Sequence, residues 1–278
     1  MAKKILFAAG CSYTDKDYVS FDNSLPKDRM GGWKFWPEIM ADELNLTCVN
    51  AGKSGRGADF MFNETIKAIA MYGDRLDTIA ILWSGSDRSS FYNYDFNPLV
   101  EIDIDPRHKR KDGAVWDPFI WMDQIGIGKV NRNFWASQHF NKSVYTHMIE
   151  NQLIKMLSII EICKAKNIKL VMGQGLIFFN YHVLENMWAE KKLTEKAYIT
   201  KKEVLDIFLK NSLFPRLERH KSNIVGWPFI KELGGRTYDD IRINKEKYFI
   251  SKLDRHPNAM GQELFANIFL EQYKKVYE

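Results

Sequence analysis

Short apolar runs alternate with helix-like stretches through the first third of the chain, and this alternation constrains the fold more than any other feature. The runs Lys3 to Ala9, Leu46 to Val49 and Asp77 to Ser84 have the length and apolar character of buried strands. Between them, Trp36 to Leu44 and about Ala58 to Tyr72 repeat apolar residues at helical spacing. Strand, helix, strand, helix, strand in this order predicts a doubly wound parallel sheet in a three-layer α/β/α, flavodoxin-like arrangement.

The same pattern resumes in the second half of the chain. We expect a long amphipathic helix from Val144 to Lys166 and a fourth strand from Ile168 to Met172. A fifth strand is expected within Asn223 to Phe229, and a closing helix after Asn258.

Two segments interrupt this pattern. The first, at about 88–142, is rich in aromatic residues, which argues against disorder and predicts a lid or wall packed over the sheet. The second, at about 175–222, is lysine-rich and predicted to be helical in part. With no internal repeat and no low-complexity linker, the prediction is a single domain, 1–278, with two insertions.

Composition and the lengths of the apolar runs indicate the cellular compartment and the partners to expect for such a domain. Three cysteines among 278 residues leave an odd one, which suits a reduced compartment better than a disulfide framework. The apolar run from Ile5 to Ala9 is too short for the core of a signal peptide, and no stretch approaches the length of a membrane span. We expect a cytoplasmic protein without a membrane partner. The net charge of +5 is modest, and nucleic acid ranks last among the partners considered.

Three segments distant in sequence should meet at one edge of the predicted sheet. In doubly wound sheets, ligands bind beyond the carboxyl ends of the strands. Gly10 to Thr14 follows the first strand, Asn50 to Gly57 the second, and Trp83 to Arg88 the third. His256, which opens the last helix, could reach the same edge.

These segments carry the groups that nucleophilic catalysis requires. A serine nucleophile needs a base, a group that orients the base, and donors for the developing oxyanion. Ser12 lies on a tight turn after a strand, with His256 as candidate base and Asp254 as candidate orienting carboxylate. The backbone N–H groups of Ser12 and Gly52 are candidate oxyanion donors, since glycine lets the backbone approach a substrate closely.

The same segments resemble the conserved blocks of SGNH hydrolases, also called GDSL-like esterases and lipases. Gly10 to Thr14 resembles the first block, Gly-Asp-Ser-x-Thr, and Asn50 to Gly55 resembles the second, whose glycine N–H serves the oxyanion hole. Asp77 to Asp87 is similar to the third block, which ends Gly-x-Asn-Asp, and Asp254 to Pro257 is similar to the fifth, Asp-x-x-His-Pro. The resemblance implies a Ser-His-Asp site formed by Ser12, His256 and Asp254.

The sequence departs from the family pattern at three points. Cys11 replaces the first-block aspartate, which takes no part in proton transfer. The third-block asparagine, an oxyanion donor in the family, falls on Ser86, with Ser84 in place of a glycine. Loss of such a donor can cost roughly 3 kcal/mol in barrier. Asp254 lies two residues before His256, whereas the family usually spaces the pair by three.

The same residues also have simpler, structural interpretations. Ser12 could be a turn or capping residue, and Cys11 is a rival nucleophile, although a cysteine beside an apolar strand is usually a buried filler. The glycines from Gly52 to Gly57 could cradle a phosphate at a helix N-terminus. The basic run Arg107 to Lys111 is most simply a solvated loop. No histidine pair has metal-ligand spacing, so neither a metal nor a cofactor is expected.

The hypothesis that unites these observations is a serine hydrolase that cleaves an oxygen ester, with a short acyl group such as acetyl on a carbohydrate. Oxyanion donors would be Ser12, Gly52 and Ser86, and substrate contacts Tyr13, Asn50 and Arg88. A binding protein that has lost catalysis on the same fold, and an acyltransferase that uses the same acyl-enzyme, remain alternatives. First blocks with Gly-Cys-Ser resemble those of SGNH-like proteins in bacteriophage genomes. The sequence leaves the oligomeric state open.

Overall fold

The chain forms a five-stranded parallel sheet in the order β2-β1-β3-β6-β7. The computed structural model describes residues 3–26, 30–85, 89–90, 119–120, 142–176, 178, 200–242 and 246–278. Counted along the chain, the strand order is 2-1-3-4-5, which is the flavodoxin-like order expected from the sequence. The strands are β1 (Ile5–Gly10), β2 (Thr47–Asn50), β3 (Leu76–Trp83), β6 (Lys169–Gln174) and β7 (Ile224–Val225).

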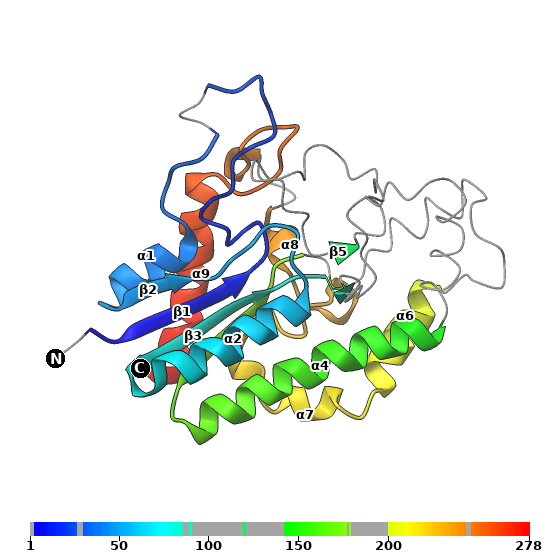
Figure 1. Ribbon diagram of the computed structural model, residues 1–278. Coiled ribbons are helices and arrows are strands. Elements are labelled where there is room, and N and C mark those ends of the chain that lie inside the picture. The colour runs from blue at the N-terminus through cyan, green and yellow to red at the C-terminus, as the bar shows by residue number, and fades with distance from the viewer. Residues whose placement is uncertain are drawn as a thin grey trace, which may run out of the picture.

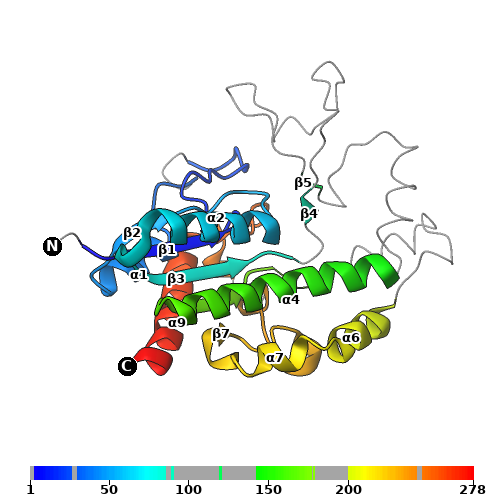
Figure 2. The ribbon, with the colours of Figure 1, turned by 60° about the horizontal axis from the view of Figure 1, so that its bottom comes forward.

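Helices cover both faces of the sheet, as Figure 1 shows. On one face α1 (Trp36–Glu43) packs against α9 (Ala259–Tyr277), and on the other α2 (Ala58–Tyr72) packs against α4 (Lys142–Ala165). The shorter helices α6 and α7 lie along α4 (Figure 2). Since both faces are covered, the three central strands are buried along almost their whole length. The remaining helices and strands are α6 (Lys201–Lys210), α7 (Phe214–Glu218), α8 (Tyr238–Arg242), and the antiparallel pair β4 (Ser89–Ser90) and β5 (Phe119–Ile120).

Capping residues explain where several of these helices begin. A proline in the first turn of α1 costs no hydrogen bond there, and the Glu38 carboxylate accepts the Phe35 N–H at 2.8 Å. Thr200 and Glu203 form a reciprocal capping box at the start of α6. Asn258 caps α9 by accepting the Gly261 N–H at 3.0 Å.

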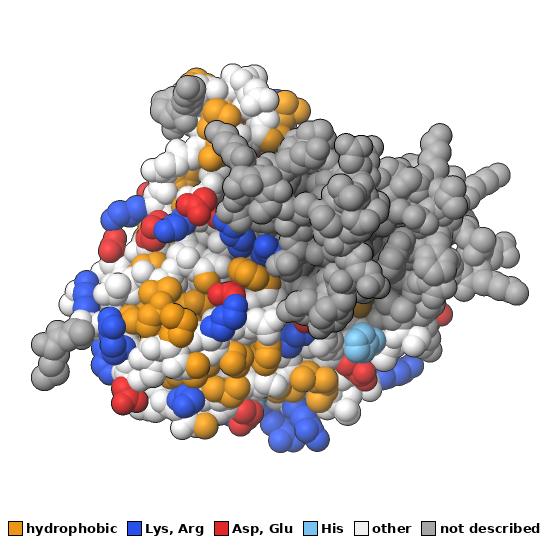
Figure 3. Space-filling model, viewed as in Figure 1, with side chains coloured by type: hydrophobic (Ala, Val, Ile, Leu, Met, Phe, Trp, Pro, Cys, Tyr) orange, Lys and Arg blue, Asp and Glu red, His pale blue; other side chains and the backbone are white. Residues whose placement is uncertain are grey.

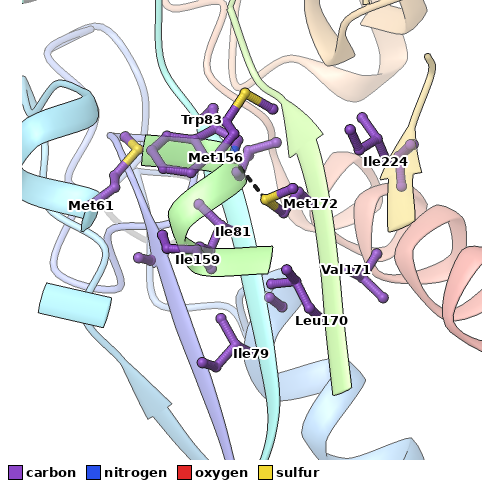
Figure 4. Packing of buried hydrophobic residues seen from close by; sticks show 14 of the residues in the cluster. Met61, Ile79, Ile81, Trp83, Met156, Ile159, Leu170, Val171, Met172 and Ile224 are labelled. Atoms are coloured by element: carbon purple, nitrogen blue, oxygen red, sulfur yellow. Dashed lines mark hydrogen bonds between the residues drawn. The ribbon is translucent and has the colours of Figure 1, made fainter. Parts of the chain in front are cut away.

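The core is continuous across the sheet. In Figure 4, side chains from β3 and β6 interleave with those of the covering helices, and the Trp83 indole N–H reaches Met172 Sδ at 3.3 Å. On the other face, the rings of Trp36 and Phe269 stack 4.5 Å apart and join α1 to α9. This packing fixes the strand ends that carry the candidate site.

Sequence and structure agree on the main elements and differ at the fifth strand. The expected strand within 223–229 is only Ile224–Val225. Gly226 follows with φ +72°, a left-handed conformation that turns the chain out of the sheet. Most of the aromatic-rich segment expected at about 88–142, and residues 179–199 of the second insertion, lie outside the described residues.

Two surface properties bear on possible partners. No helix in the described ranges is both long and apolar enough to span a bilayer. On the face seen in Figure 3, lysine and arginine side chains stand among acidic and apolar ones rather than forming one basic surface over the described residues. The basic run at 107–111 lies outside the described residues.

Candidate active site

Ser12 lies on a tight turn directly beyond the carboxyl end of β1. The Cys11 carbonyl accepts the N–H groups of Thr14 at 2.9 Å and Asp15 at 3.1 Å, which closes the turn. A Cβ atom at Gly10 would fall 2.0 Å from Thr14 Oγ1, so only glycine fits at the strand end. The turn therefore presents Ser12 at the edge where ligands bind in such sheets.

The structure brings Ser12, His256 and Asp254 together. The distance from His256 Nε2 to Ser12 Oγ is 2.9 Å, and that from His256 Nδ1 to Asp254 Oδ1 is 2.6 Å. The spacing of two residues between the acid and the histidine does not prevent this contact. The same Oδ1 also accepts the backbone N–H of His256 at 3.0 Å, so the short connection itself holds the ring against the carboxylate.

Asp254 is fully buried, and two hydroxyl groups donate to its second oxygen. Ser20 Oγ lies 2.6 Å and Tyr18 Oη 2.8 Å from Asp254 Oδ2. Burial raises the pKa of this carboxyl, but the hydrogen bonds and the charge of His256, with the bond from Ser20, outweigh it and hold the pKa at about 2. Asp254 is therefore a carboxylate throughout the neutral range.

Two tyrosine rings enclose the imidazole. Tyr18 stacks on His256 with ring centroids 4.1 Å apart, and Tyr13 meets it edge-on at 5.4 Å. Tyr13, expected from the sequence to contact substrate, is buried, and its hydroxyl donates to Asp239 at 2.9 Å. In this structure Tyr13 contacts the imidazole from within the core, and its contact with substrate stays a prediction.

The loop that carries Asp254 and His256 is tied down on both sides. Ser251 Oγ accepts the Asp254 N–H at 2.9 Å and donates to Asp22 Oδ2 at 2.5 Å. Asn258 Nδ2 donates to the carbonyl of Phe249 at 2.8 Å while its Oδ1 caps α9. The loop after Ser12 and the loop before α9 are thus joined by hydrogen bonds between residues more than two hundred positions apart.

The glycine-rich segment after β2 packs against the turn that carries Ser12. The Gly52 N–H donates to Asn50 Oδ1 at 2.8 Å, and Asn50 Nδ2 donates to the Thr14 carbonyl at 2.8 Å. A Cβ atom at Gly52 would lie 2.5 Å from the Thr14 carbonyl carbon. Gly52 and Asn50 therefore join the two loops, and the Gly52 N–H is engaged within the protein.

A third contact holds the two loops together. Asp15 is buried, and its Oδ2 accepts both the N–H of Ser54 at 2.8 Å and the Ser54 hydroxyl at 2.7 Å. Gly55 comes next, with φ +76°. In the described part of the chain, the Gly55 N–H has no acceptor. From the sequence Asp15 had no predicted role, and Gly55 was named only as the last residue of the segment Asn50 to Gly55.

The third predicted segment is only partly described. Ser84, directly after β3, is buried, and its carbonyl accepts the Gln174 side-chain N–H at 2.6 Å. Ser86 and Arg88, predicted as an oxyanion donor and a substrate contact, lie outside the described residues.

The cysteines show no sign of a competing thiolate site. All three are free, and Cys11, next to Ser12, has no exposed surface. Burial raises the pKa of Cys48 and of Cys163 to about 12, which keeps both as neutral thiols.

Comparison with known proteins finds similarity only among solved structures. No protein-family model matches the chain, and a search of curated proteins found no match. One solved structure is the psychrotrophic esterase EstA from Pseudoalteromonas, at 9% identity and TM-score 0.45, covering 98% of each chain. Another is a member of the lipolytic protein G-D-S-L family from Veillonella parvula, at 14% identity and TM-score 0.40, covering 96% of this chain and 97% of that one. A variant of Axe2, an acetyl xylan esterase from Geobacillus stearothermophilus, matches at 13% identity and TM-score 0.38, covering 97% and 94%.

Proposed function

We propose that this protein is a serine hydrolase that cleaves an oxygen ester, with Ser12 as nucleophile, His256 as general base and Asp254 as the group that orients the base. The observation that carries the proposal is the chain of two contacts, 2.9 Å from Ser12 Oγ to His256 Nε2 and 2.6 Å from His256 Nδ1 to Asp254 Oδ1. A hydroxyl, an imidazole and a buried carboxylate in this order are the parts of a serine-nucleophile site.

The geometry supports an acyl-enzyme mechanism. Ser12 Oγ attacks the ester carbonyl while its proton passes to His256 Nε2, and Asp254 stabilises the imidazolium that forms. The imidazolium then protonates the departing alcohol, leaving the acyl group on Ser12. In the second half, His256 takes a proton from water, the resulting hydroxide attacks the acyl carbon, and Ser12 leaves with the proton returned to it.

Backbone donors would hold the negative charge on the carbonyl oxygen. The Ser12 N–H follows the strand end and has no acceptor among the described residues. Gly52 would have to break its bond to Asn50 to donate, whereas the neighbouring Gly55 N–H needs no such change. We therefore assign the first two donors to Ser12 and Gly55, and retain the Ser86 hydroxyl as the third from the sequence.

The substrate class we propose is a short acyl ester, such as an acetyl group on a carbohydrate. This part of the proposal rests on the sequence resemblance. A panel of p-nitrophenyl acetate, butyrate and octanoate, together with an acetylated oligosaccharide, tests it. The proposed class requires the highest kcat/KM on acetyl esters and acetate release from the oligosaccharide; a maximum on octanoate would replace it with a longer acyl group.

Hydrolysis of p-nitrophenyl acetate by three proteins tests the mechanism. Wild type should turn over the ester, and Ser12→Ala should lose at least about 10³-fold in kcat. Ser222→Ala is the matched control, because Ser222 is exposed and precedes β7 at the opposite end of the strands. Equal turnover by wild type and Ser12→Ala would reject the proposed nucleophile.

A further inference from the structure

Tyr18 contacts both His256 and Asp254, although it belongs to neither of the segments that supply them. Its hydroxyl lies 2.7 Å from His256 Nδ1 and 2.8 Å from Asp254 Oδ2, and its ring stacks on the imidazole with 29° between the planes. The nitrogen that Tyr18 approaches is the one facing away from Ser12. The tyrosine is therefore placed to influence the base without touching the nucleophile.

The contacts among Tyr18, His256 and Asp254 show which atoms carry the hydrogens. Asp254 is ionised, so its Oδ1 can lie 2.6 Å from His256 Nδ1 only if Nδ1 carries a hydrogen. The single hydrogen of Tyr18 then goes to Asp254 Oδ2, and a lone pair of Tyr18 Oη faces the Nδ1–H. In this arrangement the Nδ1–H lies between two oxygen acceptors, and the lone pair of Nε2 points to Ser12.

The opposite tautomer is disfavoured by the same groups. If the neutral ring carried its hydrogen on Nε2, the Nδ1 lone pair would face the Asp254 carboxylate at 2.6 Å. Tyr18 could relieve this only by turning its hydrogen to Nδ1, which would remove a donor from Asp254. Such a ring could not accept the Ser12 proton, since Nε2 would already be protonated.

We propose that Tyr18 is a positioning residue that holds the His256 ring, whose tautomer Asp254 sets, in place for proton transfer from Ser12 and stabilises the imidazolium through its ring face and hydroxyl oxygen. This inference rests on the proposed function. When the Ser12 O–H bond breaks and the Nε2–H bond forms, the positive charge develops beneath the Tyr18 ring, where a cation is favoured. Tyr18 keeps its own proton, because burial and the Asp254 charge raise its pKa.

The loop that carries Tyr18 is held by other contacts, so its hydroxyl can be tested by itself. The Ser20 N–H donates to the Met30 carbonyl at 2.9 Å, and Asp22 accepts the Ser251 hydroxyl. Asp15 anchors the beginning of the loop on Ser54. Removal of one phenolic oxygen should leave this framework in place.

Tyr18→Phe is the decisive variant, because it keeps the stacked ring and removes only the hydroxyl. We expect kcat to fall about 10-fold with KM changed less than 2-fold, since the loss affects the proton transfer and not substrate binding. In Tyr18→Leu, which also loses the aromatic face, kcat should fall about 100-fold. Tyr238→Phe is the matched control: Tyr238 is buried in the core, and among the described residues its hydroxyl has no hydrogen-bond partner.

Nitrogen NMR of ¹⁵N-histidine-labelled protein gives a readout that does not depend on turnover. The signal of His256 is identified by its loss in His256→Gln. Titration of this signal should show the imidazolium losing its proton at a lower pH in Tyr18→Phe than in wild type or Tyr238→Phe, because the variant lacks the hydroxyl oxygen that faces the Nδ1–H. An unchanged titration and an unchanged kcat in Tyr18→Phe would overturn the proposal.

The two readouts separate this inference from the proposed function. If wild type has Ser12-dependent esterase activity but Tyr18→Phe matches it in kcat and in the titration of His256, only the role of Tyr18 is refuted. If wild type hydrolyses no ester, the proposed function fails, and the titration still decides whether Tyr18 stabilises the imidazolium.

Discussion

Asp15 accepts both hydrogen bonds that Ser54 can donate, one from its backbone N–H and one from its hydroxyl. This pair joins the turn that presents Ser12 to the glycine-rich loop after β2. The carboxylate is buried, so removal of its charge leaves two donors to be satisfied where water has little access. The proposed oxyanion donors Ser12 and Gly55 lie on the two loops that Asp15 connects.

Asp15→Asn should therefore lower both stability and activity. The asparagine amide has nearly the same shape as the carboxylate. It would face Ser54 either with its NH2 group, which cannot accept a hydrogen bond, or with an uncharged oxygen, which is a weaker acceptor than the carboxylate. We expect a loss of about 1–3 kcal/mol in the free energy of unfolding, measured by urea titration. A fall in kcat on p-nitrophenyl acetate should accompany it.

Asp17→Asn is the matched control for that substitution. The Asp17 side chain is 68% exposed, and its ion pair with Lys53 is long, at 3.8 Å. Exposed pairs contribute little, so the stability should change by less than about 0.5 kcal/mol. Equal effects of the two substitutions would mean that the Asp15–Ser54 connection has no special role.

Asp254→Asn should reduce activity with little change in shape. The amide can present an N–H to His256 Nδ1 and so favour the tautomer that cannot accept the Ser12 proton. Replacement of the orienting carboxylate in such a site costs about 10⁴-fold in kcat. A kcat within 10-fold of wild type would show that Asp254 does not orient the base.

Acid should remove part of the stability that Asp254 contributes. Its folded-state pKa of about 2 lies below its ordinary value of 3.8, so the ionised form stabilises the folded protein above about pH 4 and does so progressively less as the pH falls toward 2. The contribution is on the order of 1–2 kcal/mol after allowance for solvent screening. Urea titrations from pH 5 to pH 3 should find the stability difference between wild type and Asp254→Asn shrinking; a constant difference would contradict this linkage.

Gly52→Ala should destabilise the protein because the two loops pack without room for a methyl group. The added Cβ would lie 2.5 Å from the carbonyl carbon of Thr14, and backbone cannot move aside as a flexible side chain can. We expect a loss of at least about 2 kcal/mol, seen as a lower midpoint of thermal unfolding. An unchanged midpoint would show that the loops separate easily.

Cys11→Ala should retain esterase activity. Cys11 is buried and its thiol has no exposed surface, so we expect it to fill space and not to react with substrate. Substitution should cost about 1 kcal/mol of stability and leave kcat within about 3-fold of wild type. Loss of activity in Cys11→Ala, with Ser12→Ala still active, would show that Cys11 and not Ser12 is the nucleophile.

The sheet and its helices could be predicted because their signals are local. The apolar run of β3 and the helical spacing of α2 depend only on neighbouring residues, and both elements lie where the sequence indicates. The two-residue spacing of Asp254 and His256 did not determine whether the carboxylate reaches the imidazole. In the structure a backbone hydrogen bond to the same oxygen makes it geometrically possible.

Contacts between distant segments determine the roles of Tyr18, Asp15 and Gly52. No local sequence pattern therefore predicts these roles. Tyr18 lies in an irregular polar loop, and only folding places it against a histidine 238 positions later. Gly52 and Gly55 look alike in a glycine-rich run, and they are told apart by the Asn50 side chain that accepts one of their N–H groups. The one available signal was the concentration of aspartate, serine and tyrosine after Ser12, a composition typical of hydrogen-bonded loops.

Covalent labelling with a fluorophosphonate tests the central claim most directly, because the reagent reacts with a serine only when a base activates it. After digestion, mass spectrometry should place the phosphonyl group on Ser12 in wild type. His256→Gln should label at least about 10²-fold more slowly, and Ser222→Ala at the wild-type rate. Wild type that stays unlabelled at Ser12, or labels there equally fast without His256, would contradict the proposed catalytic site.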